Sequence, residues 1–483
     1  MTADFPVYVA AVLALLLACH TGPPSIVLVS LDTLRADRLG AFGNSDGLTP
    51  NLDRFASEAT IFTQAYSQAN ETCFSHASLF TGRYPSELGR LDQDFRLDDT
   101  TPVASTMLKA YGYHTGASVA GGFLDPVFGF SRGFDHYDSP VQWASLYHSF
   151  PLALDWLDTL PKREPFFLFL HGYDTHQRYL KPSPYGHAWV DPTYQGVAQT
   201  LVEELDGTLR ITDGIVRPAM TLLEVQSRTD VRFRTEQARA RLKLEGATST
   251  DSLRLVNEAD EAYVRDIYDG SVAYADAMFG VFMAGLAERG LLDETAIVVI
   301  SDHGEGLGED GLFNHRFGVG DPETHVPVMI RLPGGKNGGR RVDDLVELVD
   351  ILPTLAEIAG ATPPASIRGR SLLPATRGEA LAPKDAAFTE GAFRMVAVRT
   401  PKGRLTFSGL APDSEWLDDV IQGVRFDSPG ITTSPGLTES DKVDLRDKIV
   451  AWRRALPPAP DNTAITDPAL KEELRARGYW GAN

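Results

Sequence analysis

Two short polar clusters in the chain have the residue types that bind a divalent metal ion. Asp32 follows the apolar run Ser25–Leu31, and Asp302 with His303 follows a second run, Thr295–Ser301. A carboxylate at a strand end is a natural metal ligand, and an adjacent Asp and His add one oxygen and one imidazole nitrogen. The three residues together predict a site for one divalent ion.

A candidate nucleophile lies in the segment Glu71–Pro85, which reads ETCFSHASLFTGRYP. We expect Ser75 to be the N-cap of a short helix that ends at Gly82, so that Thr72 lies just before the helix. Backbone amides at such an end favour an anion or a developing alkoxide. A neighbouring metal ion would lower the pKa of the hydroxyl further, so Thr72 is the predicted nucleophile.

Continuous apolar runs separate these clusters and are typical of strands buried on both faces. Besides the two runs above, Pro165–His171 and Val326–Leu332 have this character, while Asn51–Ala59 and Ala275–Arg289 show helical spacing. The alternation predicts an α/β fold with a mostly parallel central sheet flanked by helices. Polar clusters that follow the strands of such a sheet meet at one edge.

The chain divides into a large predicted domain and a smaller one. We expect a catalytic domain at 24–375, interrupted by a polar, helical insertion at about 186–265, and a C-terminal subdomain at 376–483. The subdomain should contain a small sheet, with a hairpin formed by Met395–Thr400 and Arg404–Phe407. A terminal helix should follow, with Asp467 as its N-cap and Pro468 at its first position.

The first 19 residues resemble a secretory signal peptide with a lipoprotein box. Val7–Ala18 is uninterruptedly apolar, yet it is shorter than the roughly 20 residues of a spanning helix. Cys19 follows Leu-Leu-Ala and would become a lipid attachment point. A buried N-terminal helix is the alternative. The favoured interpretation predicts an exported lipoprotein, periplasmic or in the cell envelope, anchored to a membrane surface rather than spanning it.

Composition excludes several classes of protein. The 483 residues include 45 Lys and Arg against 65 Asp and Glu, giving a net charge of −20, and 43% are hydrophobic, as in globular domains. The acidic balance argues against a nucleic-acid partner, because phosphate binding needs clustered basic residues. Only Cys19 and Cys73 are present, which excludes a disulfide framework. The oligomeric state stays open.

On these motifs the chain resembles the sulfatase family, within the alkaline-phosphatase-like superfamily of metal-dependent hydrolases. The matching stretches are Ile26–Gly43, Leu48–Asp53, Ala77–Pro85, Ser131–Asp135, Ala296–Glu305, Val349–Pro374 and Leu474–Tyr479. The resemblance covers nearly the whole chain except the insertion and parts of the C-terminal region. It implies a sulfatase-like central sheet with flanking helices, and an enzyme that hydrolyses anionic sulfate or phosphate esters.

The nucleophile motif departs from the usual family pattern. Usual sulfatases carry C-x-P-S-R before T-G-R, and the Cys becomes formylglycine. Counting nine residues back from Thr81 gives Thr72, whereas Cys73 stands one place late and lacks the following Pro and Arg. We therefore expect no formylglycine. A Thr at this position resembles family members that transfer or hydrolyse phosphoryl groups, and it also occurs in many sulfatase-like chains.

The resemblance implies that Asp32, Thr72, Asp302 and His303 surround the metal. Because His303 replaces an oxygen ligand of typical sulfatases, zinc or manganese is favoured, with calcium or magnesium as alternatives. Two-metal relatives place a His four residues after an Asp in the middle of the chain. Here that position, four after Asp174, is Arg178. A single metal ion is therefore predicted.

Two further histidines are candidate catalytic and substrate-binding residues. His176 matches the substrate-contacting His of the family and could bind a peripheral oxygen or protonate the leaving group. His315 falls where relatives place a Lys or His against the transferred group, so we expect it to protonate the departing alcohol. His171 could equally orient the loop or act in the site, and we expect Glu305 to cap a turn.

Three functions remain open at this point. The first is ester hydrolysis through a covalent intermediate on Thr72. The second is a phosphodiesterase, or a phosphoglycerol or phosphoethanolamine transferase, acting on envelope lipid or glycan. The third is a non-catalytic binding lipoprotein, which retention of Asp32, Thr72, His176, Asp302 and His303 disfavours. The natural substrate is not determined by the sequence.

Overall fold

The structure is a computed structural model. It describes residues 22–89, 95–141, 143–176, 179, 181–196, 199, 258–309, 314–315, 318–391, 395–407, 426, 431–457, 465 and 467–476. Cys19 and the rest of the predicted signal peptide lie outside the described residues, as do Arg178 and positions 201–257 of the predicted insertion.

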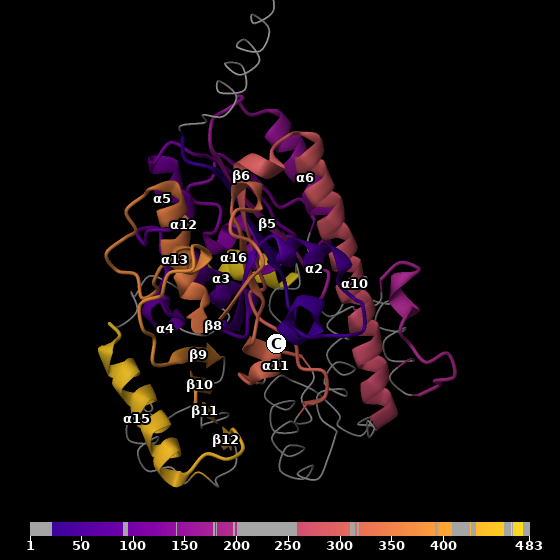
Figure 1. Ribbon diagram of the computed structural model, residues 1–483, viewed down its shortest axis with the longest axis vertical. Coiled ribbons are helices and arrows are strands. Elements are labelled where there is room, and N and C mark those ends of the chain that lie inside the picture. The colour runs from indigo at the N-terminus through magenta and orange to yellow at the C-terminus, as the bar shows by residue number, and fades with distance from the viewer. Residues whose placement is uncertain are drawn as a thin grey trace, which may run out of the picture.

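An eight-stranded sheet forms the centre of the molecule (Figure 1). Its strands follow the order β4-β3-β5-β1-β6-β7-β2-β8. In chain order the strands are β1 Ser25–Leu31, β2 Thr60–Tyr66, β3 His114–Ser118, β4 His136–Asp138, β5 Phe166–Gly172, β6 Thr295–Ile300, β7 Val328–Arg331 and β8 Arg340–Glu347. Only β7 runs antiparallel to its described neighbours. The predicted α/β class with a mostly parallel sheet is confirmed.

Two apolar layers cover the two faces of the sheet. Along β1, Ile26 and Leu28 face one layer while Val27 and Val29 face the other, as the alternation of side chains along a strand requires. The first layer contains α3 Thr72–Thr81, α5 Ala104–Ala110 and α12 Ile351–Ala359. The second contains α2 Pro50–Ser57, α6 Leu146–Asp158 and α10 Glu258–Glu288. Both faces of the sheet are therefore buried under apolar side chains, which explains the continuous apolar runs in the strands.

The longest described helix is α10, whose 31 residues run along one side of the molecule in Figure 1. By length and composition it could cross a membrane, but 56% of its most apolar window is buried inside the fold. Ile267, Phe279 and Phe282 have no exposed surface and pack in the second layer. It is therefore a core helix of the α/β domain.

A second, four-stranded antiparallel sheet follows in the C-terminal part of the chain, in the order β12-β11-β10-β9. Its strands are β9 Ala387–Gly391, β10 Met395–Thr400, β11 Gly403–Phe407 and β12 Ile431–Thr433, so the predicted hairpin is confirmed. Helix α15, Glu439–Ala455, packs on it. The last helix, α16 Pro468–Ala476, begins at the predicted residue, and the Ala469 amide donates to the capping Asp467 at 2.9 Å.

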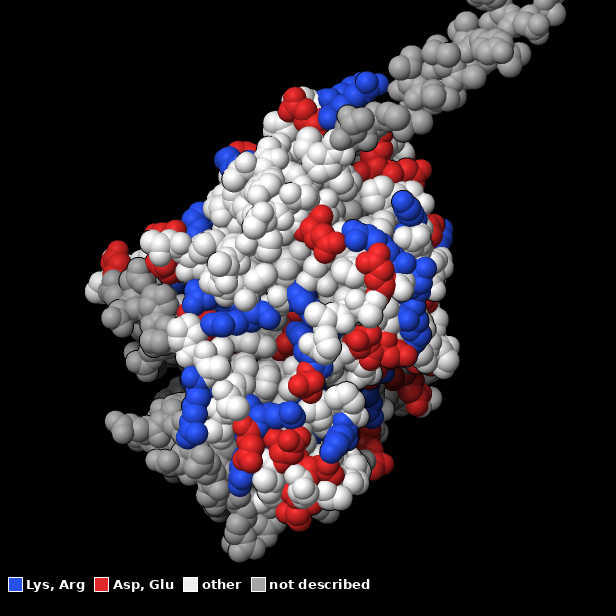
Figure 2. Space-filling view, turned by 60° about the vertical axis from the view of Figure 1, so that its left-hand side comes forward, with Lys and Arg blue, Asp and Glu red and all other residues white. Residues whose placement is uncertain are grey.

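Three short α-helices, besides several 3-10 turns, also belong to the described fold: α4 Pro85–Leu88, α11 Asp321–Thr324 and α13 Leu373–Thr376. On the surface, basic and acidic side chains are interspersed across the face shown in Figure 2. Several basic side chains among the described residues are paired over short distances. Lys384, for example, lies 2.7 Å from Glu347 and 2.8 Å from Asp350.

Candidate active site

The ends of three adjacent parallel strands bring the predicted metal ligands together. β1 lies between β5 and β6, and Ser30 is in register with His171 on one side and Ile300 on the other. The residues that follow these positions must therefore meet at one edge of the sheet. Asp32, Asp302 and His303 are at most 1% exposed, so the cluster is fully shielded by protein.

Thr72 reaches this edge from the start of helix α3. It is the first residue of the helix, so the expectation that it would precede a helix capped by Ser75 is wrong. The Ser75 hydroxyl instead donates to the Asp302 carbonyl oxygen at 2.6 Å, which ties the helix to the loop after β6. Gly82 ends the helix in the left-handed conformation, at φ 66°, as predicted.

The Thr72 hydroxyl, and not the neighbouring thiol, faces the cluster. Its Oγ1 donates to Oδ2 of Asp32 at 3.0 Å and lies 3.4 Å from Nε2 of His303. Cys73 is only 6% exposed and belongs to the apolar layer that contains Ile26. Burial raises the pKa of the Cys73 thiol well above its ordinary value. Of the two side chains, the Thr72 hydroxyl lies at the ligand cluster and the Cys73 thiol lies in the apolar core.

The residues around Thr72 fit a divalent cation. Asp32, Asp302 and His303 each offer one ligand atom, and these atoms lie within 4.8 Å of one another. Among the described residues, Oδ1 of Asp32 and Oδ2 of Asp302 have no hydrogen-bond partner although both are buried. Burial raises the pKa of Asp32 to about 6 and that of Asp302 above its usual range. A divalent cation bound between these two carboxylates would satisfy both oxygens and offset their charge.

Two more buried histidines, His76 and His171, lie next to these ligands and Thr72. Nδ1 of His76 lies 2.8 Å from the Thr72 carbonyl oxygen and its Nε2 lies 3.0 Å from the Ser30 hydroxyl, so both ring nitrogens are engaged. Nε2 of His171 lies 3.1 Å from Oδ2 of Asp32. Burial lowers the pKa of both imidazoles to about 4, which keeps them neutral at pH 7. With Asp302, they form a second group of converging ligand atoms.

Asp302 is also oriented by a strained residue of the β1 loop. Thr33 has a φ of 58°, a left-handed conformation that is unfavourable for a β-branched residue. Its amide donates to Oδ1 of Asp302 at 3.3 Å, and the Tyr268 hydroxyl holds the Thr33 carbonyl at 2.7 Å. Strain of this kind persists where the surroundings enforce it, often at functional sites. Oδ1 of Asp302 is thus occupied, and Oδ2 remains for a cation.

The two remaining candidate histidines lie in the same site. The ring of His315 is 4.4 Å from that of His303 and 5.2 Å from that of His176, measured between centroids. Nδ1 of His315 lies 3.1 Å from Oε1 of the fully buried Glu305. Glu305 therefore holds His315, a contact that the expectation of a turn-capping role does not include.

Known proteins are similar to this chain over the region that contains these site residues. The sulfatase family profile matches residues 24–361. The chain belongs to the sulfatase family. An N-acetylglucosamine-6-O-sulfatase of Bacteroides thetaiotaomicron is 25% identical over 76% of this chain and 73% of its own length. An arylsulfatase of Clostridium perfringens is 28% identical, covering 72% of this chain and 77% of the relative.

Solved structures show the same fold. The phosphonate monoester hydrolase of Agrobacterium radiobacter superposes with a TM-score of 0.65 at 18% identity, covering 90% of this chain and 96% of the hydrolase. As a member of this family, the sulfatase described here is a hydrolase acting on ester bonds, and a divalent metal ion is typical of its relatives. The expected family and enzyme class are confirmed.

Asp174 of this sulfatase has a structural role. Its carboxylate accepts hydrogen bonds from the Ser145 hydroxyl at 2.5 Å and the Leu146 amide at 2.7 Å, which caps the start of α6. It belongs to neither group of converging ligand atoms among the described residues. Both of these hydrogen bonds of the Asp174 carboxylate therefore serve the start of α6.

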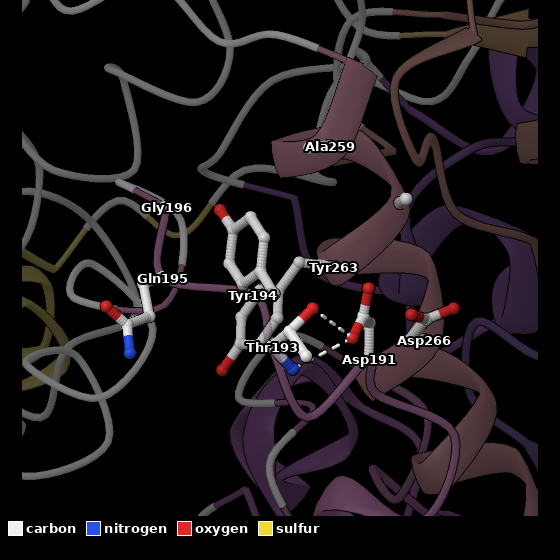
Figure 3. A pocket seen from close by; sticks show the side chains of 9 residues that line it. Asp191, Thr193, Tyr194, Gln195, Gly196, Ala259, Tyr263 and Asp266 are labelled. Carbon is white, nitrogen blue, oxygen red and sulfur yellow. Dashed lines mark hydrogen bonds between the residues drawn. The ribbon is translucent and has the colours of Figure 1, made fainter.

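A surface cavity of about 400 Å³ lies elsewhere, beside the N-terminal half of α10 (Figure 3). Its wall includes Tyr194, Tyr263 and Asp266, and Asp191, which accepts hydrogen bonds from the Thr193 amide and hydroxyl at 2.8 and 2.7 Å. None of the predicted site residues lines it. The cavity is therefore separate from the candidate active site.

The sequence does not single out His76, gives Glu305 only a turn-capping role and leaves the role of His171 open. A signal was present for His76, because it stands four residues after Thr72 and must share the same face of a helix. No comparable signal exists for Glu305. Its contact with His315 depends on how the loop at 314–315 returns toward β6.

Proposed function

We propose that this sulfatase hydrolyses sulfate monoesters of carbohydrates through a covalent intermediate on Thr72. The observation that carries the proposal is the position of the Thr72 hydroxyl, 3.0 Å from Asp32 and 3.4 Å from His303 in a buried cluster of ligand atoms. The similarity to an N-acetylglucosamine-6-O-sulfatase supports a sugar as the alcohol part of the ester.

Asp32, Asp302 and His303 would hold one divalent ion, with the Thr72 oxygen beside it. The mixture of carboxylate oxygens and an imidazole nitrogen favours zinc or manganese over calcium. Such an ion, when bound, lowers the pKa of a neighbouring hydroxyl and neutralises charge on the ester oxygens. The rest of the chemistry belongs to side chains of the chain itself.

In the first step, Oγ1 of Thr72 forms a bond to sulfur as the bond between sulfur and the sugar oxygen breaks. The hydroxyl proton passes to Oδ2 of Asp32, which already accepts its hydrogen bond. The departing oxygen takes a proton from Nε2 of His315, and Glu305 holds the opposite nitrogen of that ring at 3.1 Å. His176, whose ring is 5.2 Å from that of His315, would bind a peripheral sulfate oxygen.

In the second step, water replaces the threonine oxygen at sulfur. The water oxygen bonds to sulfur and one of its protons returns to Nε2 of His315. The bond between sulfur and Oγ1 breaks, and the proton held by Asp32 returns to Thr72. Hydrogen sulfate leaves and ionises. The enzyme is restored with no co-reactant other than water.

Attack at phosphorus is the second candidate reaction. The specific observation in its favour is that a threonine hydroxyl faces the cluster while Cys73 lies in the apolar core, which leaves no formylglycine route. Phosphate or phosphonate monoesters, phosphodiesters and headgroup transfer use the same in-line geometry. The sulfate proposal rests on the curated relatives and the phosphorus alternative on the nucleophile.

A panel of esters separates the two. The metal-reconstituted full chain is assayed with N-acetylglucosamine 6-sulfate, 4-nitrophenyl sulfate, 4-nitrophenyl phosphate and bis(4-nitrophenyl) phosphate. The proposal expects the highest kcat/KM on a sulfate ester. A higher value on either phosphate would replace it with the second candidate. No turnover of any of the four by enzyme with a full complement of metal would overturn hydrolysis of simple esters.

We also propose that the chain is exported and anchored by a lipid on Cys19. The support is the apolar run Val7–Ala18 directly before Cys19, and the start of β1 at Ser25, which leaves a short connection. Such an anchor would hold the catalytic domain close to a membrane surface. Radiolabelled palmitate should label the wild-type chain and not Cys19→Ser. Equal labelling, or none, would contradict the proposal.

A further inference from the structure

Trp143 is a partly exposed aromatic residue between β4 and α6. Two of the five large apolar side chains that are exposed among the described residues lie close to it in sequence. Val141 is 42% exposed and Tyr147 is 63% exposed. Trp143 itself is of intermediate burial.

The backbone at Trp143 is held in a conformation that a bulky residue seldom adopts, with φ at 56°. Hydrogen bonds on the next residue enforce it: the Ala144 amide donates to Ala120 at 3.0 Å, and the Ala144 carbonyl accepts from the Tyr173 amide at 3.0 Å. Ala120, Ala144 and Tyr173 form a small apolar cluster, separate from the main core, and the indole packs against it. A conformation so strongly enforced commonly serves ligand binding.

The indole also lies at the edge of the candidate active site. Its ring centroid is 6.0 Å from that of His176, with 30° between the ring planes. His176 is next to His315 at 5.2 Å, and His315 is next to His303 at 4.4 Å. A continuous line of rings therefore runs from a candidate metal ligand to Trp143. A group bound at His176 would therefore lie next to this indole.

We propose that Trp143 is a binding subsite that stacks on the pyranose ring of the sugar carrying the scissile sulfate. A pyranose has an apolar face of C–H groups and a polar rim, and a flat indole complements that face. Trp143 presents apolar surface beside the ionisable groups that would bind the ester, which is the division of roles expected in a ligand site. The inference rests on the proposed carbohydrate sulfatase function and names where the sugar binds.

The test is a binding measurement that needs no turnover. Thr72→Ala enzyme, full length and loaded with metal, is titrated in a calorimeter with N-acetylglucosamine 6-sulfate and with propyl sulfate, which has no ring. The titrations are repeated with the double variant Thr72→Ala/Trp143→Leu. Leucine keeps apolar packing on the cluster but removes the aromatic face. We expect about tenfold weaker binding of the sugar sulfate, with propyl sulfate unchanged. Trp143→Phe should restore most of the affinity.

Other outcomes overturn the subsite. If Trp143→Leu weakens both ligands equally, the residue acts only through the fold of the site. If the sugar sulfate binds no better than propyl sulfate to the parent enzyme, no sugar subsite exists. If 4-nitrophenyl sulfate shows the dependence on Trp143 and the sugar sulfate does not, the occupant is an aryl ring. Tyr111→Ala, at a 45% exposed tyrosine, is the matched control and should change nothing. The proposed function is tested separately, by measuring turnover of the esters by wild-type enzyme.

Discussion

Nε2 of His171 lies 3.1 Å from Oδ2 of Asp32, the same oxygen that accepts the Thr72 hydrogen bond. Burial lowers the pKa of His171 to about 4, so the ring is neutral and can donate one N–H to the carboxylate. Oδ1 of Asp32 has no partner among the described residues. Because Oδ2 is held from two sides, Oδ1 is left for a cation, and His171 acts as a positioning residue.

Replacing His171 should therefore weaken metal binding at Asp32, Asp302 and His303 without removing any of these three ligands. For His171→Ala we expect a loss of about 10- to 100-fold in metal affinity, the usual effect of removing a group that orients a ligand. Competition with a fluorescent chelator measures it. His114→Ala, at a surface ion pair with Glu164, is the control. An unchanged affinity in His171→Ala would show that the contact with Asp32 has no such role.

The contact between Glu305 and His315 predicts a dependence on the leaving group. His315→Ala should lose about 10²- to 10⁴-fold in kcat on an alkyl sulfate, which needs a proton, and far less on 4-nitrophenyl sulfate. Glu305→Gln should show the same pattern to a smaller degree, because it leaves His315 in place without its carboxylate partner.

A double-mutant cycle separates this role from a structural one. If Glu305 acts through His315, the Glu305→Gln change should cost nothing further in the His315→Ala background. Equal losses on the alkyl and nitrophenyl esters, or fully additive effects of the two changes, would contradict the assignment. The measurement is the reaction rate of each variant as a function of the pKa of the leaving alcohol.

Cys73 should be dispensable for the chemistry. Its side chain packs in the apolar layer and its thiol pKa is raised by burial, so Cys73→Ala should cost on the order of 1 kcal/mol of stability and leave kcat within a few-fold. An aldehyde-reactive probe should label neither wild type nor variant. Labelling that is present in wild type and lost in Cys73→Ala would identify formylglycine after all.

Buried Glu323 predicts a pH dependence of stability. Burial raises its pKa from 4.5 to about 7 in the folded chain, with Glu309 adding to the shift and Arg35 opposing it. Between these values the unfolded chain ionises while the folded chain keeps the proton. Glu323 therefore adds on the order of 3 kcal/mol to the free energy of unfolding below about pH 4.5. This contribution is lost as the pH rises towards about 7.

Glu323→Gln removes this loss. Urea unfolding of the metal-free chains at about pH 5 and about pH 8 should show the variant gaining stability relative to wild type at the higher pH. Glu288→Gln, at an exposed position near the end of α10, is the control and should show no such change. A difference between Glu323→Gln and wild type that is independent of pH would contradict the raised pKa.

Much of the central sheet is predictable from the sequence because it is buried on both faces. The apolar run Ser25–Leu31 has the observed bounds of β1. The runs at Pro165–His171, Thr295–Ser301 and Val326–Leu332 differ from β5, β6 and β7 by one or two residues at their ends. Since polar residues follow β1 and β6 directly, the meeting of Asp32 with Asp302 could also be foreseen.

The rest depends on tertiary contacts that no local pattern encodes. Ser75 has the residue type of an N-cap, yet its hydroxyl bonds the Asp302 carbonyl, and α3 starts at Thr72 instead. The partner of Glu305 is His315, ten residues further along the chain, and the pairing depends on the position of residues 314–315. The left-handed backbone of Trp143 is enforced by hydrogen bonds between segments near 120, 144 and 173.

The central claim is that Thr72 carries the covalent intermediate. Wild-type, metal-loaded enzyme is quenched during turnover of its best ester and its peptides are analysed by mass spectrometry. The account predicts a sulfuryl adduct, or a phosphoryl adduct if the substrate is a phosphate, on the peptide that contains Thr72, with the modification localised to that residue. In Thr72→Ala the adduct and the turnover should both be lost while metal content stays unchanged. Near-normal turnover in Thr72→Ala, or an adduct on another residue, would contradict it.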